Sequence, residues 1–203
     1  MTVSLLHHTP ITNCDLAISK CWDKPYDAAN VNYDKIDRIA NKFKHESTIE
    51  HIVYQFDISG VSRALLQEQA RHRMASYSVK STRYTLSELK QEPSIGLEQL
   101  TKYCVLTGIE AVDLATLSAL ENLYKLVQSG ISNDYIKYAL PEAYKTSYVM
   151  TINARSLRNF IALRSSKSAL WEIRLLAQAI YNIIPDDHKF LFHLEGDTHD
   201  STS

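Results

Sequence analysis

The sequence predicts an α+β fold of one domain in which helices outweigh strands. Apolar residues recur at three- and four-residue spacing over most of the chain, which is typical of amphipathic helices. One stretch, residues 52–59, instead alternates apolar and polar residues with the period of a strand. The 203 residues are 45% apolar and 22% charged, which is enough for one well-cored domain and too little for two comfortable ones. We therefore expect a single domain over residues 1–194, followed by a polar, disordered tail over residues 195–203.

The first half of the chain alternates between these two periods. Residues 13–22 and 33–44 have helical spacing, and Asp34 is placed to cap the second helix. Residues 51–60 form the clearest strand and end at a glycine. Residues 61–72 return to helical spacing, so we expect the residues that follow to form a loop.

The second half is mostly helical. Residues 94–128 form the longest helical stretch, with a break expected near Gly108. Its apolar members, which we expect to be core, are Leu97, Leu100, Val105, Ile109, Val112, Leu120, Leu123 and Leu126. The remaining elements are a helix over 133–140 halted by Pro141, a short strand over 147–151, a helix after Asn153 with Leu157, Phe160, Ile161 and Leu163 as its apolar residues, and a last helix over 168–184.

Charge and hydropathy narrow the function classes. The formal net charge of −1 disfavours a general nucleic-acid binder, which usually carries a basic surface overall. Residues 1–13 lack the basic and apolar regions of a leader, and no segment approaches the roughly 20 apolar residues that span a bilayer. We expect a cytoplasmic protein that binds neither nucleic acid nor membrane.

Cysteine and glycine usage excludes several kinds of site. Cys14, Cys21 and Cys104 form no CxxC pair, and the spacing of the first two predicts buried thiols on a helix rather than a nucleophile. The five glycines form neither GxGxxG nor GxxxxGK[ST], so a bound nucleotide would be held by side chains and helix ends.

Residues 71–84 (RHRMASYSVKSTRY) contain four permanent cations interleaved with hydroxyl groups. No acid lies between Glu68 and Glu88, so these cations repel one another unless an anion or a distant acid neutralises them. Arginine suits phosphate because its planar fork makes paired, charge-assisted hydrogen bonds. The window is therefore a candidate anion site.

A second basic region covers residues 153–167 and has no acid between Glu142 and Glu172. On a helix, Arg155, Arg158, Asn159 and Ala162 fall on one face and would present a polar strip. Two explanations stay open for both regions: a shared anionic ligand, or solvated arginines paired with acids elsewhere in the chain.

Residues 45–51 (HESTIEH) superficially resemble the HExxH zinc motif. The two histidines are six residues apart, not four, and point to different sides of a helix. We expect no metal site here.

The segment Arg71-His72-Arg73, followed after seven residues by Ser81 and then by Arg83-Tyr84, resembles the RHRx7S signature of the flavin-dependent thymidylate synthases. The likeness continues through residues 45–51, 137–141 and 153–164, in the family's order and spacing. It spans most of the chain.

The resemblance implies the fold of that family, with a small, mostly antiparallel sheet. It also implies an FAD enzyme that methylates dUMP to dTMP, with methylenetetrahydrofolate as carbon donor and NADPH as reductant. The family forms homotetramers whose active sites are shared between subunits. A flavin route needs no cysteine nucleophile, in keeping with the cysteines found here.

The resemblance also assigns site residues. The implied flavin contacts are Ser47, Glu50, Arg71, His72, Arg73, Val79, Asn153, Ala154, Arg155 and Asn159. The implied dUMP contacts are Glu68, Gln69, Ala70, Arg71, Val79, Lys80, Ser81, Thr82, Arg83, Tyr84, Lys137 and Arg164, with Arg164 as the catalytic residue.

Two positions depart from the family pattern. Residue 79 is valine where many members have Gln or Glu, and residue 137 is lysine rather than arginine. Val79 offers only backbone or apolar contact, and Lys137 only a point charge.

Three other functions stay open on the sequence. A nucleic-acid-binding module would show steep salt dependence and no flavin. A flavoprotein that is non-catalytic, or that acts on another pyrimidine nucleotide, would bind flavin without forming dTMP. A purely structural helical protein would do neither.

Overall fold

The computed structural model describes residues 1–194, so the expected tail lies outside the described residues. Within that range four strands form one sheet, in the order β1 (Thr2–His8), β2 (Val53–Ser62), β4 (Lys145–Asn153) and β3 (Ala75–Val79). The predicted fold class, helix-rich α+β with a small antiparallel sheet, is confirmed.

The two central strands carry the alternation from which strands are predicted. In β2, the side chains of Tyr54, Phe56 and Ile58 are fully buried, and in β4 those of Met150 and Ile152 are buried. Because successive side chains of a strand point to opposite faces, each strand gives one face to the core. The strand expected over 147–151 is real and longer than expected at both ends.

By its internal contacts the described chain divides into two compact units. The first, called the basic unit below, comprises residues 2–57, 69–77 and 149 onward. The second, called the helical unit, comprises Met1 and residues 58–68 and 78–148. The extent of a single catalytic domain over residues 1–194 stays a prediction.

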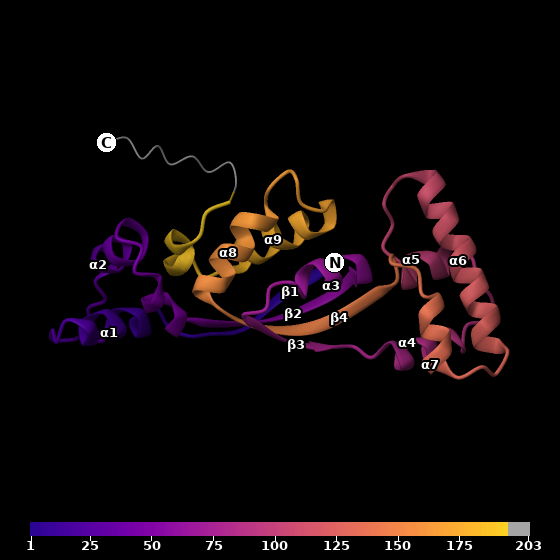
Figure 1. Cartoon of the computed structure of the whole chain (residues 1–203), viewed down its shortest axis with the longest axis horizontal. Helices are drawn as coiled ribbons and strands as arrows, with labels where there is room; N and C mark the ends of the chain where they lie inside the picture. Colours follow the sequence, from indigo (N-terminus) through magenta and orange to yellow (C-terminus); the bar gives the residue numbers. More distant parts are fainter. Residues whose placement is uncertain (195–203) are drawn as a thin grey trace. The chain divides into compact units, whose positions relative to one another are not determined.

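In the basic unit, helical elements lie between β1 and β2 and after β4 along the sequence. Helices α8 (Ala154–Arg164) and α9 (Trp171–Ile183) pack against each other, and α9 contacts β1 (Figure 1). The other helical elements are α1 (Thr12–Cys21), α2 (Tyr33–Asp37), the π-helical turn η1 (Arg38–Lys42) and the 3₁₀ helices η2 (Glu46–His51) and η4 (Asp186–Leu191).

The helical unit has its own apolar core. Its helical elements are α4 (Thr82–Leu89), α5 (Leu97–Tyr103), α6 (Glu110–Gln128), α7 (Asn133–Ile136) and the 3₁₀ turn η3 (Lys137–Ala139). Leu86, Leu100, Leu120, Leu123 and Tyr144 are among the buried residues that form this core. Helix α3 (Arg63–Gln69) follows β2 and ends where the chain passes back to the basic unit.

The break expected near Gly108 is confirmed, and it divides the stretch 94–128 into α5 and α6. Gly108 has φ +76, and the Asp113 carboxylate accepts hydrogen bonds from the backbone of Thr107 (2.8 Å) and Gly108 (3.1 Å), which fixes the turn. Part of the expected core of this stretch is wrong, because Leu97, Ile109 and Val112 are exposed.

The start of α2 is also capped differently from the prediction. The Asn32 side chain, not that of Asp34, accepts the hydrogen bond from Lys35 N at 2.8 Å. The helix expected over 33–44 changes to π-helical geometry at residue 38.

The window expected to be a loop contains two regular elements. Ala75 to Val79 form β3, with Ala75 and Tyr77 partly buried and Ser76 and Ser78 exposed, and α4 begins after Ser81. Strand β1 was not predicted at all. Short strands with few large apolar residues have a weak periodic signal.

Candidate functional site

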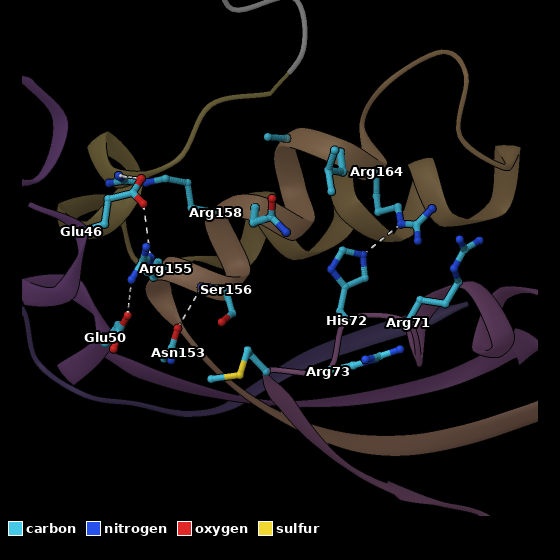
Figure 2. A pocket seen from close by; sticks show the side chains of 14 residues that line it. Glu46, Glu50, Arg71, His72, Arg73, Asn153, Arg155, Ser156, Arg158 and Arg164 are labelled. Carbon is cyan, nitrogen blue, oxygen red and sulfur yellow. Dashed lines mark hydrogen bonds and ion pairs between the residues drawn. The ribbon is translucent and has the colours of Figure 1, made fainter. Parts of the chain in front are cut away.

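A cavity of about 750 Å³ lies within the basic unit. Three segments line it: η2 with Glu46 and Glu50, the turn of residues 71–74 between α3 and β3, and α8. Figure 2 shows Glu46, Glu50, Arg155 and Arg158 at one end and Arg71, Arg73 and Arg164 at the other. The two basic regions of the sequence therefore meet at one cavity within a single chain.

Helix α8 presents one polar and one apolar face. The Asn153 side chain caps the helix by accepting a hydrogen bond from Ser156 N at 2.9 Å. Leu157, Phe160 and Ile161 are buried, while Leu163, expected among them, is 56% exposed and lines the cavity. The predicted polar strip of Arg155, Arg158, Asn159 and Ala162 is confirmed, because all four line the cavity.

The turn that carries Arg71, His72 and Arg73 is fixed by Tyr77 of β3. The Tyr77 hydroxyl lies 3.0 Å from His72 O and 3.1 Å from Gln69 O, and His72 N donates to Gln69 O at 3.0 Å. Burial raises the pKa of Tyr77, so its O–H remains a donor at neutral pH. The exposed side chains of Arg71 and Arg73 therefore extend from an ordered backbone.

His72 links this turn to the end of α8. The Nε atom of Arg164 donates a hydrogen bond to Nε2 of His72 at 3.0 Å. The His72 ring also packs edge-on against Phe160, with ring centroids 5.0 Å apart. An acceptor at Nε2 requires a neutral imidazole with its proton on Nδ1.

Acids from η2 pair with part of the second basic region. Glu50 Oε1 accepts a hydrogen bond from Arg155 Nη1 at 2.7 Å, which raises the pKa of Arg155. Glu46 lies 3.3 Å from both Arg155 Nε and Arg158 Nη1. Acids elsewhere in the chain therefore pair with both Arg155 and Arg158, although Arg155 also lines the cavity. Even so, the described residues lining the cavity include five arginines and two glutamates.

The helical unit holds most of the implied dUMP contacts. A cavity of about 490 Å³ is lined by Arg83, Tyr84 and Ser87 of α4 and by Ser132, Asn133 and Asp134 at the start of α7. Asn133 Nδ2 donates to Arg83 O at 3.1 Å, and Arg83 Nη1 lies 3.6 Å from Asp134 Oδ1.

Two lysines of the helical unit differ in how they are held. Lys80 Nζ donates a hydrogen bond to Glu88 Oε1 at 2.9 Å, so this lysine is also paired with an acid of the same chain. Lys137 is exposed, with Nζ 5.9 Å from the centroid of the Tyr138 ring.

The structure brings together most, but not all, of the implied flavin contacts. Those that line the large cavity are Glu50, Arg71, His72, Arg73, Asn153, Arg155 and Asn159, together with Arg164. Ser47 lines a different cavity of about 500 Å³ beside α1, and the side chain of Ala154 is fully buried. Val79, at the end of β3, is exposed and does not line the large cavity.

Among the implied dUMP contacts, Gln69 is placed least favourably. The residue is fully buried, with Nε2 3.0 Å from the sulfur of Met150 and its carbonyl oxygen hydrogen-bonded to the Tyr77 hydroxyl and His72 N. In contrast, Ala70, Arg83 and Tyr84 are exposed, while Glu68, Ser81 and Thr82 are partly exposed.

Glu46, Met74, Ser156 and Leu163 line the cavity without having been singled out. Glu46 had a signal, since Glu46 and Glu50 are two acids four residues apart that could pair with the arginines of α8. Nothing in the sequence distinguishes the other three.

The thiols do not supply a nucleophile from the core. Burial raises the pKa of Cys14 to about 11 and that of Cys104 to about 12. Cys21 is exposed, so its expected burial is wrong: a seven-residue spacing does not keep the last residue of a short helix inside.

The residues described include no helix long and apolar enough to cross a membrane. The fold and the large cavity define an α+β protein with an arginine-rich cavity, lined by a helix and an adjacent turn, that suits an anionic ligand. An arginine-rich cavity of this size suits a nucleotide better than a single phosphate.

Comparison with known proteins places this class in a family. A family model described as "Thymidylate synthase complementing protein" matches residues 4–188. The flavin-dependent thymidylate synthase of Wolinella succinogenes is 54% identical over 200 residues, which cover 96% of this chain and 98% of that protein. That of Helicobacter pylori is 44% identical over 202 residues, which cover 95% and 97%.

A crystal structure of thymidylate synthase X from Helicobacter pylori with FAD and dUMP has a TM-score of 0.89 to this chain at 43% identity. The match covers 95% of this chain and 97% of that one. A second structure from the same organism, complexed with FAD and dUMP, has a TM-score of 0.90. The chain belongs to the flavin-dependent thymidylate synthase family.

Proposed function

We propose that this protein binds FAD and dUMP and converts dUMP to dTMP by reductive methylation. The observation that carries the proposal is the meeting of the 71–73 turn and α8 around one cavity, with Arg164 held by His72 at its edge. Family membership over residues 4–188 supports the same reaction.

The residues lining the large cavity fit FAD. A flavin dinucleotide carries a pyrophosphate between two ring systems, and the cavity offers arginines at both of its ends. Asn153, Ser156 and Asn159 add neutral hydrogen-bonding groups along α8, suited to sugar hydroxyls and ring edges. The volume of about 750 Å³ lies in the range of ligand cavities.

FAD, when reduced, supplies a hydride, so that no covalent bond between enzyme and substrate is required. The protein's own contribution is binding, orientation and charge stabilisation. Arg164 against the uracil edge favours loss of the N3 proton and stabilises the resulting negative charge, which activates the ring. His72 fixes the direction of that guanidinium through the 3.0 Å hydrogen bond.

The dUMP phosphate needs cations outside the flavin contacts. Arg83 and Lys137 of the helical unit are exposed and are proposed to neutralise it, with Ser81 adding one directed hydrogen bond. Asp134 Oδ1 lies 3.6 Å from the Arg83 guanidinium, and both residues line the cavity of the helical unit. Lys137 contributes a single ammonium charge to phosphate binding, in place of the planar guanidinium of an arginine.

We further propose that methylenetetrahydrofolate donates the carbon and NADPH the electrons, and that the enzyme works in the cytoplasm. The assembly is proposed to be a homotetramer with shared active sites. Exposed apolar side chains of α6, among them Val112 and Leu114, support a subunit contact. An active monomer on a sizing column would contradict this assembly.

Titration of the purified protein with FAD, followed by dUMP, tests the proposal. We expect saturable quenching of flavin fluorescence, and then a change in the flavin absorption spectrum on adding dUMP. The matched control is dCMP, which has the same sugar and phosphate but no N3–H at its base edge. A flavin absorption spectrum that does not change on adding dUMP would indicate a different substrate. The absence of flavin binding would overturn the proposal.

A further inference from the structure

Arg158 is a fixed point of the basic unit rather than a ligand contact. Its Nε donates to Leu191 O and its Nη2 to Asn41 Oδ1, each at 2.7 Å. Its Nη1 lies 3.3 Å from both Ala40 O and Glu46 Oε1. All three nitrogens of the guanidinium are thus engaged by η1, η2 and the end of η4. Burial lowers the pKa of Arg158, with Glu46 opposing that shift.

Glu46 connects this fixed arginine to an exposed one. Its Oε1 faces Arg158, while its Oε2 lies 3.3 Å from Nε of Arg155. The Arg155 side chain is half exposed and lines the cavity. Within residues 1–194 Glu46 engages its Nε and Glu50 its Nη1, which leaves Nη2 to a ligand.

We infer that Glu46 is a positioning residue for the cofactor. Its carboxylate is held by the fixed guanidinium of Arg158 and in turn restrains the side chain of Arg155, so that Arg155 is already oriented toward bound FAD. The inference rests on the proposed function. An exposed arginine samples many rotamers, and fixing it before the ligand arrives lowers the entropic cost of binding. Glu50 alone cannot do this, because its carboxylate is itself 42% exposed and has no contact with Arg158.

Simple electrostatics makes the opposite prediction. Glu46 places a negative charge in a cavity that takes an anion, so on Coulombic grounds its removal strengthens binding. A positioning role means that removal weakens binding. The sign of the change therefore distinguishes the two effects.

Two substitutions separate the effect of the Glu46 charge from the effect of the Glu46 side-chain length. Glu46→Gln keeps the shape and removes the charge, whereas Glu46→Asp keeps the charge but is one methylene too short to span both arginines. We expect each to raise the FAD dissociation constant about tenfold, a typical coupling between groups in direct contact. Flavin fluorescence titration measures this without turnover. The charge-matched control is Asp186→Asn, on η4, whose carboxylate is 93% exposed and pairs with Lys189.

A double-mutant cycle with Arg155→Ala completes the test. If Glu46 acts through Arg155, Glu46→Gln has no further effect on FAD affinity in the Arg155→Ala background. Tighter binding by Glu46→Gln, or an equal loss in both backgrounds, would overturn the inference while leaving the proposed function intact. A wild-type protein that binds no flavin would overturn both.

Discussion

Arg164 and His72 lie 92 residues apart in the sequence and are joined by a hydrogen bond from Nε to Nε2 at 3.0 Å. This contact connects the turn of the RHR motif to the last residue of α8. Since His72 also packs on the buried Phe160, the guanidinium of Arg164 is oriented by the core of the basic unit. A cation held in advance at the place where charge develops is an effective stabiliser of a transition state.

Arg164→Ala should therefore lower kcat far more than it raises KM for dUMP. Loss of a preorganised electrostatic group typically costs about 10²–10³ in kcat. Steady-state kinetics at saturating dUMP measure it, with Arg38→Ala as control because Arg38 is exposed and outside the cavity. Near-normal turnover by Arg164→Ala would remove Arg164 from the catalytic role.

His72 is expected to act mainly through Arg164. Glutamine can place an acceptor near the position of Nε2, whereas alanine cannot. His72→Gln should retain much of the wild-type kcat and His72→Ala should lose about tenfold or more, the range for groups coupled by direct contact. The discriminating measurement is the double variant: His72→Ala in the Arg164→Ala background should change kcat little. Additive losses would show that His72 acts independently of Arg164.

Asn153 combines a structural and a ligand-facing role that two substitutions can separate. Asn153→Ala removes the cap of α8, which typically costs about 1 kcal/mol of stability. Asn153→Asp keeps the acceptor for Ser156 N but adds a negative charge to the cavity. We expect thermal unfolding to be lowered by Asn153→Ala and nearly unchanged by Asn153→Asp, while FAD affinity falls in both. Unchanged FAD affinity in Asn153→Asp would exclude a contact between Asn153 and the cofactor.

His188 makes stability depend on pH. It is fully buried, with Nδ1 2.8 Å from the Tyr54 hydroxyl, and desolvation lowers its pKa, with Asp187 opposing the shift and His8 adding to it. The unfolded chain therefore binds this proton more readily than the folded one. The stability from neutral His188 is present above the unfolded pKa of about 6.5 and is lost as the pH falls below it.

Replacing His188 tests that dependence. Asparagine can keep a hydrogen bond to Tyr54 but cannot titrate, so His188→Asn should flatten the fall in Tm between about pH 7 and pH 5. His7→Asn serves as control, because His7 is exposed on β1. Calorimetry at several pH values would refute the assignment if wild type and His188→Asn had the same slope.

Much of the fold follows from periodicity, and its errors have local causes. Helices α1, α8 and α9 and strand β2 were predicted because their apolar spacing is regular and their ends carry caps or breakers. Strand β3 was missed because its alternation is carried by Ala75, Tyr77 and two serines, which resemble a loop in composition. The break before α6 was expected at Gly108, and the structure adds the Asp113 carboxylate, which reaches back five and six residues to fix the turn.

The candidate site was predictable as a set of residues but not as a network. Arg155 and Arg158 are equivalent in the sequence. The Arg155 side chain is nevertheless exposed to the cavity, whereas the Arg158 guanidinium is occupied by structural hydrogen bonds. That difference depends on carbonyl groups at residues 40 and 191, which no local pattern places near α8. The burial of Gln69 likewise depends on Met150, 81 residues away.

Formation of dTMP by the purified protein tests the central claim most directly. The protein is given dUMP, methylenetetrahydrofolate, NADPH and FAD, and each component is omitted in turn. We predict dTMP that disappears when FAD, NADPH or the folate is left out. Bound flavin with no dTMP in the complete mixture would contradict the account.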